Sequence, residues 1–339
     1  MEIVATIRKI NENLNMIDLY NKLMGFGINS FRFNFSKAEA SEANLSDFIE
    51  TFNIAKGMSN SINTMLDMPY PGRKIRVNSN FTSINIVAGE KYYLCINSNN
   101  QKGDSERTLY LNAILPLKAI CKGLHIVYDI GQGAFTVTNI QSDEIIELIA
   151  ENSFTLYNLK SISLGYIETN EYYELLDGLC EKLQPNKVAL SFVNRRNDLT
   201  EAISLKKKYG FSLISKIESE EGMKNVLEIA TASDGIMFGR GDLCLNADPS
   251  HLLDYQVQVS KICHQEKCEL YFATDFLTSL FHNYIPTRSD LIDLQYAVSL
   301  APTGIILNVD LVVSDGIKRA VELIRENEKI QSQNSNSYR

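Results

Sequence analysis

Eight short apolar runs rich in β-branched residues recur along this 339-residue chain, and a stretch with helical periodicity follows each of them. Alternating strands and helices favour a closed parallel barrel with its helices outside, so we expect a (β/α)8 TIM barrel. A doubly wound open sheet is the competing architecture, but no G-x-G-x-x-G follows the first strand. The expected strands are Ile3–Ile7, Ser30–Phe35, Ile62–Met68, Val188–Val193, Ser212–Ile217, Gly235–Gly239, Glu269–Thr274 and Thr303–Asn308.

One long stretch breaks this rhythm. Residues 77–159 alternate polar and apolar side chains at period two, as in "HIVYDIGQGAFTVTNI", with glycine at the turns. The pattern predicts a small all-β domain inserted after the third barrel strand. Residues 1–76 and 160–330 then form the barrel domain, and the polar residues 331–339 form a flexible tail.

Composition narrows the class of protein without selecting a function. An apolar fraction of 45% and a charged fraction of 22% are typical of a soluble globular protein. The formal charge is −8 and the basic residues are scattered, which argues against binding to nucleic acid or to an anionic membrane. No apolar run reaches the length of a membrane span, so we expect a cytoplasmic protein. The six cysteines lack zinc-site spacing and are expected to be reduced structural thiols.

Polar residues cluster where the predicted strands end, which is where the active sites of (β/α)8 barrels lie. Lys216 and Glu218 are two apart on one strand, so their side chains point the same way. Asp242 follows a Gly-Arg-Gly turn whose amides can bind an anion. Two carboxylates with ligand oxygens and water are a usual site for Mg²⁺. A salt bridge between Lys216 and one acid explains the spacing equally well.

At these residues the sequence resembles the pyruvate kinase family. The motifs follow in family order, and the resemblance extends to about residue 325 without a counterpart of the family's C-terminal domain. It implies the barrel and the inserted β domain. The matching segments are "RFNFS" at Arg32–Ser36, "MLD" at Met65–Asp67, "KIR" at Lys74–Arg76, "ALSFV" at Ala189–Val193, "KIESEEG" at Lys216–Gly222, "SDGIMFGRGDL" at Ser233–Leu243, "AT" at Ala273–Thr274 and "PTRSDLIDLQYAV" at Pro286–Val298.

The resemblance implies a site for phosphoenolpyruvate or pyruvate. Glu218 and Asp242 are the implied ligands of Mg²⁺ or Mn²⁺. Lys216, Arg32 and Thr274 are the implied catalytic residues: the lysine stabilises an enolate or the transferring phosphoryl group, the arginine holds the phosphate, and the threonine closes over the carboxylate. The implied substrate-binding residues are Gly241, Arg240, Lys216 and Thr274. Asn34, Ser36 and Asp67 match a monovalent-cation site for K⁺. The inserted domain is expected to act as a lid, to which Asp129 belongs.

The sequence also departs from the family pattern. Met68 stands where a threonine supplies an oxygen to K⁺, which disfavours that cation. Lys37 replaces a histidine near the nucleotide, and Asp275 stands where glutamine is usual. The family's S-G-E-T-A is "NVDLV" at Asn308–Val312, without the serine linked to proton delivery. The metal and oxyanion positions therefore persist, whereas the nucleotide and protonation positions differ.

Three functions remain open on the sequence. The first is a phosphotransferase that moves phosphate between phosphoenolpyruvate and a nucleotide, ADP or ATP, or another acceptor. The second is a metal-dependent lyase or aldolase that acts on a 2-oxo acid through an enolate. The third is a diverged, non-catalytic relative. A homo-oligomer, such as a dimer through the outer barrel helices, is compatible with each of them.

Overall fold

A computed structural model describes residues 1–9, 14–35, 42–69, 73–96, 107–111, 120–129, 131–142, 144–158, 160–167 and 172–337. The chain divides into two compact units. One comprises Met1–Pro69 with Tyr173–Arg339, and the other comprises Tyr70–Tyr172.

Eight parallel strands close into a barrel in the first unit, as the sequence predicts. Around the barrel they follow the order β1-β17-β16-β15-β14-β13-β3-β2. The largest boundary difference is at β13, which ends at Leu190 because Phe192 adopts a left-handed φ of 54° that cannot continue a strand. The strands are β1 (Glu2–Ile7), β2 (Ser30–Asn34), β3 (Asn63–Met68), β13 (Lys187–Leu190), β14 (Ser212–Ile217), β15 (Gly235–Gly239), β16 (Glu269–Ala273) and β17 (Gly304–Leu307).

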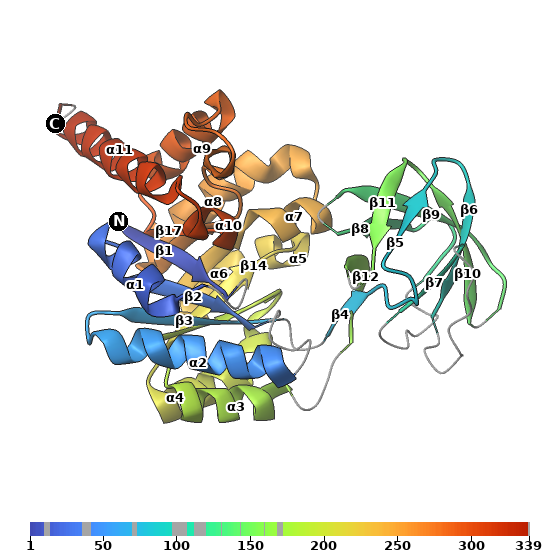
Figure 1. Ribbon diagram of the computed structural model, residues 1–339, viewed down its shortest axis with the longest axis horizontal. Coiled ribbons are helices and arrows are strands. Elements are labelled where there is room, and N and C mark those ends of the chain that lie inside the picture. Colours follow the sequence, from blue (N-terminus) through green and yellow to red (C-terminus); the bar gives the residue numbers. More distant parts are fainter. Residues whose placement is uncertain are drawn as a thin grey trace. The chain divides into compact units, whose positions relative to one another are not determined.

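Helices surround these strands, as Figure 1 shows for α1, α2, α3 and α4. α4 ends at Gly210, whose left-handed φ of 79° suits a helix C-cap. Among the described residues, no helix combines the length and apolar character needed to cross a membrane. The helices are α1 (Met16–Gly25), α2 (Glu42–Met58), α3 (Tyr172–Leu183), α4 (Thr200–Tyr209), α5 (Glu220–Lys224), α6 (Val226–Ala232), α7 (Arg240–Asn246), α8 (Leu252–Glu266), α9 (Arg288–Ser299), α10 (Val309–Val313) and α11 (Ile317–Ser337).

The C-terminal helix reaches into the expected tail. α11 continues through Ser337, so most of the segment from residue 331 is helical, and its flexibility stays a prediction. The helix is tied to the start of the chain: the N-terminal amine lies 2.6 Å from Glu328, and Arg325 donates to the carbonyl of Met1 at 2.7 Å. Figure 1 shows the N-terminus beside this helix. A polar sequence without periodicity does not reveal that the preceding helix extends into it.

Inward-pointing side chains fill the barrel in layers. Because side chains alternate along a strand, every second residue of each strand faces the interior. The middle layer is apolar: Val4, Met65, Ala189, Ile214, Met237, Tyr271, Ala273 and Ile306 form one buried cluster. Glu2 and Lys187 stand two residues before members of this cluster, on β1 and β13. Asp67 and Lys216 stand two residues after members of it, on β3 and β14. The barrel interior therefore has a polar layer at each end.

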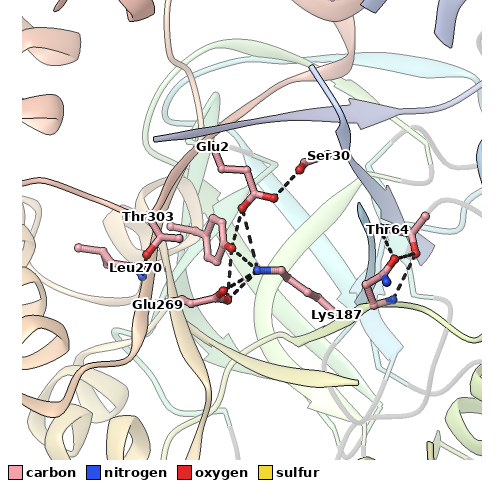
Figure 2. Close-up of polar contacts among 9 residues, drawn as sticks. Glu2, Ser30, Thr64, Lys187, Glu269, Leu270 and Thr303 are labelled. Carbon is pink, nitrogen blue, oxygen red and sulfur yellow. Dashed lines mark hydrogen bonds and ion pairs between the residues drawn. The ribbon is translucent and has the colours of Figure 1, made fainter. Parts of the chain in front are cut away.

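Figure 2 shows the polar layer at the N-terminal ends of the strands. The Lys187 ammonium lies 2.7 Å from a carboxylate oxygen of Glu269 and donates to the Tyr271 hydroxyl at 2.5 Å. That hydroxyl donates to Glu2 at 2.8 Å, and Glu2 also accepts from Ser30. Burial, then the charges of Glu2 and Glu269, raises the pKa of Tyr271. These contacts join β1, β2, β13 and β16, and polar residues at this end of a barrel serve stability.

The second unit is all β within its described residues up to Ile167. A seven-stranded sheet follows the order β4-β12-β8-β9-β10-β6-β7, and β11 pairs with β5. Its own apolar cluster includes Leu94, Phe135 and Leu148. The strands are β4 (Arg73–Arg76), β5 (Ser83–Ile86), β6 (Lys91–Cys95), β7 (Thr108–Tyr110), β8 (His125–Tyr128), β9 (Gly133–Ile140), β10 (Ile145–Ala150), β11 (Phe154–Tyr157) and β12 (Ser161–Ile167).

This unit extends beyond the expected limits of 77 and 159. β4 and β12 pair antiparallel with each other, which draws both flanking segments into the unit and places its limits at Tyr70 and Tyr172. The pairing of β4 with β12 joins the two ends of the insertion, and a pairing over that distance leaves no local signal in the sequence. Asp129, which directly follows β8, pairs with Lys160 at 2.7 Å.

Replacing Lys187 with Met will lower the free energy of unfolding by about 1–3 kcal/mol, because it leaves the carboxylates of Glu2 and Glu269 together without their cation. Urea unfolding measures the change. Lys207→Met, an exposed position on α4, is the control and should stay within about 0.5 kcal/mol of the unsubstituted protein. Equal stabilities for the two variants would contradict a stabilising role for this layer.

Candidate active site

Lys216, on β14, has three oxygen partners at the C-terminal end of the barrel. Its side chain is 9% exposed. The ammonium donates to the Ser191 hydroxyl at 2.8 Å and to Asp67 Oδ1 at 3.2 Å, and it lies 3.2 Å from Glu218 Oε1. The salt bridge that the spacing of Lys216 and Glu218 left open is therefore present, and Asp67 shares in it.

Asp67 lies between two cations. The Nε and Nη2 atoms of Arg32 contact its Oδ2 at 2.6 and 2.5 Å, while Lys216 contacts its Oδ1. Arg32 also donates through Nη1 to the Thr6 hydroxyl at 3.0 Å. Arg32 faces Asp67 because β2 and β3 are adjacent and parallel, and both residues stand at inward positions of their strands. The barrel thus brings together residues from β1, β2, β3 and β14.

The pKa values in this cluster reflect mutual stabilisation of charge. Burial by itself raises the pKa of Asp67, but the charges and hydrogen bonds of Lys216 and Arg32 outweigh it and hold this pKa below its usual range. Burial by itself lowers the pKa of Lys216, and Asp67, Glu218 and Asp242 outweigh it and hold that pKa above its usual range. Both groups are consequently ionised at neutral pH.

The Glu218 carboxylate is held by neighbouring main chain. Its Oε2 accepts the amide of Phe192 at 3.0 Å, and that amide is aimed by the left-handed backbone of Phe192. A Cβ atom on Gly239 would lie 2.7 Å from Cγ of Glu218 and 2.8 Å from its Oε1. Glycine at 239 therefore leaves the room that this carboxylate occupies.

Thr274 and Gly241 are in close contact. A Cβ atom on Gly241 would lie 2.8 Å from Cγ2 of Thr274, so the absence of a side chain lets the threonine lie against the main chain of α7. Thr274 has a left-handed φ of 77°, which is strained for a β-branched residue, and Asp275 follows with 58°. Asp242, also on α7, acts electrostatically on the Lys216 ammonium.

Arg240 is directed at the protein rather than at open space. Its guanidinium donates to the carbonyl oxygens of Ala273 at 3.2 Å and Thr274 at 2.5 Å, pairs with Asp293 at 2.5 Å, and lies 3.9 Å from the ring centroid of Phe276. The side chain is largely buried. These contacts hold the loop after β16, and the direct substrate contact expected from the sequence stays a prediction.

The other predicted residues fall into three groups. Asn34 stands two residues beyond Arg32 on β2 and is half-buried. Ser36 and Lys37 lie outside the described residues. Asp129 belongs to the second unit, and its role in a lid stays a prediction. Sequence reasoning missed Ser191, although it stands at an inward position two residues after Ala189, which is the signal that could have identified it.

The residues present fit a divalent cation that keeps part of its water. Among the described residues, no group of three or more His, Cys, Asp or Glu side chains is arranged to hold a metal ion by itself. Mg²⁺, however, is often bound by one or two carboxylates with water and substrate oxygens. With all groups ionised, three carboxylates (Asp67, Glu218 and Asp242) face two cations (Arg32 and Lys216), so the cluster has a net negative charge.

Comparison with known proteins identifies the family. The pyruvate kinase barrel domain matches residues 1–310. The chain belongs to the pyruvate kinase family. Similar relatives are the pyruvate kinases of Staphylococcus epidermidis (26% identical over 340 residues, 96% of this chain and 55% of the relative), Chlamydia muridarum (26% over 345 residues, 97% and 69%) and Mycoplasma genitalium (28% over 289 residues, 80% and 55%). The chain thus spans about half to two thirds of the length of these pyruvate kinases.

Replacing Asp67 with Asn will lower the free energy of unfolding by about 3–5 kcal/mol at neutral pH, because Arg32 and Lys216 lose the carboxylate that neutralises them. The pKa of Asp67 is lowered on folding, so its contribution is fully present above the unfolded value of 3.8 and is lost as the pH falls through the folded value. Urea unfolding from pH 7 to pH 3 measures both effects. The difference between the two proteins should be constant down to about pH 4 and then shrink; a difference independent of pH throughout would contradict the ion-pair role.

Proposed function

We propose that this chain is a phosphotransferase that binds phosphoenolpyruvate or pyruvate through a divalent metal and exchanges phosphate with a nucleotide. The observation that carries the proposal is the buried ammonium of Lys216 beside Glu218 and Asp242, at the end of the barrel where active sites of this fold lie. An ammonium held among carboxylates can stabilise an oxyanion that forms next to a metal.

Glu218 and Asp242 are the proposed ligands of Mg²⁺ or Mn²⁺. The bound metal supplies a positive charge that polarises the carboxylate and 2-oxo oxygens of a pyruvate-like ligand. Because the cluster has a net charge of one negative without it, a divalent cation makes the cluster net positive, which suits an anionic substrate. The same set of charges therefore favours binding of the metal before binding of the anionic substrate.

The remaining roles rest on position. Lys216 stabilises negative charge on the enolate oxygen or on the transferring phosphoryl group, since its raised pKa keeps it protonated. Arg32 contacts Asp67 through Nε and Nη2 and Thr6 through Nη1, and its remaining N–H donors are proposed to bind the phosphate. Thr274 lies against Gly241, and its hydroxyl and the Gly241 amide are proposed to hold the substrate carboxylate.

The names of the relatives support phosphate transfer, but the site also supports a second function. The charged groups suited to an enolate lie together, whereas Lys37 differs from the family at a position near the nucleotide and Asp275 stands where glutamine is usual. A lyase or aldolase acting on a 2-oxo acid would use the same metal and lysine without a nucleotide. The K⁺ site at Asn34, Ser36 and Asp67, the lid role of Asp129, a homo-oligomeric state and a cytoplasmic location stay predictions.

Pyruvate formation from phosphoenolpyruvate and a nucleoside diphosphate, with Mg²⁺ or Mn²⁺ present, tests the first function. We expect Lys216→Met to lower kcat by at least about a hundredfold, because it removes the cation that faces the oxyanion. We expect Glu218→Gln to remove the activation by Mg²⁺ or Mn²⁺, because it removes a proposed ligand of the metal. Glu266→Gln, at an exposed position on α8, is the control. No activity with any nucleoside diphosphate, together with metal-dependent exchange of pyruvate methyl protons into deuterium, would favour the lyase or aldolase.

Replacing Gly239 with Ala will weaken Mn²⁺ binding by about tenfold or more, because the new Cβ displaces the Glu218 carboxylate. Water proton relaxation measures the affinity directly. Gly178→Ala is the matched control, since no atom lies within 4 Å of a Cβ at that position on α3. An unchanged affinity in a folded Gly239→Ala protein would exclude Glu218 as a metal ligand.

A further inference from the structure

Ser191 lies one residue beyond β13 and is 5% exposed. Its hydroxyl donates to the main-chain carbonyl of Met68 at 2.8 Å. A serine hydroxyl has a single hydrogen, so this bond leaves only lone pairs for other partners. The Lys216 ammonium, 2.8 Å away, therefore meets an oriented acceptor.

The turn that contains Ser191 contacts Lys216 on β14 and Glu218, the residue that follows β14. The amide of Phe192 donates to Glu218 Oε2 at 3.0 Å, and the amide of Val193 donates to the carbonyl of Lys216 at 3.2 Å. The left-handed backbone of Phe192 turns its amide toward Glu218. An unfavourable conformation for an aromatic residue is thus retained where it serves the site.

The position of the ammonium affects what Glu218 can bind. The Lys216 ammonium lies 3.2 Å from Glu218 Oε1, so this ammonium and a metal ion would compete for the same carboxylate. Ser191 and Asp67 provide two of the three oxygens around the Lys216 ammonium. Their hydrogen bonds keep the ammonium from moving closer to Glu218. Without the serine hydroxyl, the ammonium keeps the carboxylates of Asp67 and Glu218 as partners. We expect the ammonium to move toward Glu218, because the hydrogen bond that opposed this movement is lost.

We propose that Ser191 is a positioning residue that fixes the Lys216 ammonium and keeps Glu218 available to a metal ion. Its kinetic consequence rests on the proposed function, whereas its structural consequence does not. Ser215 provides a matched comparison, because it is a buried serine adjacent to Lys216 whose hydroxyl contacts Ser233 instead.

The experiment compares Ser191→Ala, Ser191→Thr and Ser215→Ala by kinetics, Mn²⁺ binding and crystal structure. In Ser191→Ala we expect kcat to fall about tenfold or more, KM for phosphoenolpyruvate to change by less than about threefold, and Mn²⁺ to bind several-fold more weakly. Ser191→Thr keeps the hydroxyl and should restore kcat to within about threefold, and Ser215→Ala should leave all three quantities unchanged. If Ser191→Ala does not fold, Ser191→Cys replaces it, and a smaller loss in the same direction is expected.

The crystal structures decide the proposal even without turnover. We expect the Lys216 ammonium to move toward Glu218 in Ser191→Ala and to stay in place in Ser215→Ala. An unmoved ammonium with unchanged Mn²⁺ affinity would overturn the positioning role. If the unsubstituted protein instead forms no pyruvate and exchanges no methyl protons, the proposed function fails, and the structures and Mn²⁺ affinities still test Ser191.

Discussion

A single buried carboxylate makes the site possible. Asp67, 1% exposed, neutralises Arg32 from β2 and Lys216 from β14, and without it two cations would face each other in a poorly solvated interior. Burial and the nearby charge of Arg32 act to lower the pKa of Lys216, and Asp67, Glu218 and Asp242 outweigh them and raise it. Every further role proposed for Arg32 and Lys216 depends on this compensation.

The residues that stabilise the barrel and those of the candidate site lie in different layers of its interior. Apolar side chains such as Ile214 and Met237 occupy the middle, between the cluster of Lys187 with Glu269 at one end and that of Lys216 with Asp67 at the other. Each polar cluster has internal partners for its charges, so neither needs the other for neutralisation. Replacement of residues at the site end can therefore alter chemistry while the opposite layer continues to join the strands.

Much of this arrangement was predictable because strands have a fixed period of two. Alternation predicted that Lys216, on β14, and Glu218, directly after it, point the same way, and it located the eight strands to within a few residues. Pairings across the barrel were not predictable in the same way. Asp67 and Lys216 are 149 residues apart, and spacing within one strand says nothing about which strand supplies the partner. The same reason explains why the pairing of β4 with β12 was not predicted.

Side chains beyond the strand ends escape prediction for a different reason: the period of two stops there. Arg240 follows β15 directly, and the sequence could not show that its guanidinium turns toward Ala273 and Thr274. Those two carbonyl contacts, with the ion pair to Asp293, hold Thr274 in a left-handed conformation that a β-branched residue would otherwise leave. Phe192 is held in a comparable conformation after β13. The strained residues thus lie where strands give way to loops, and the contacts that hold them orient the amide and hydroxyl groups of the site.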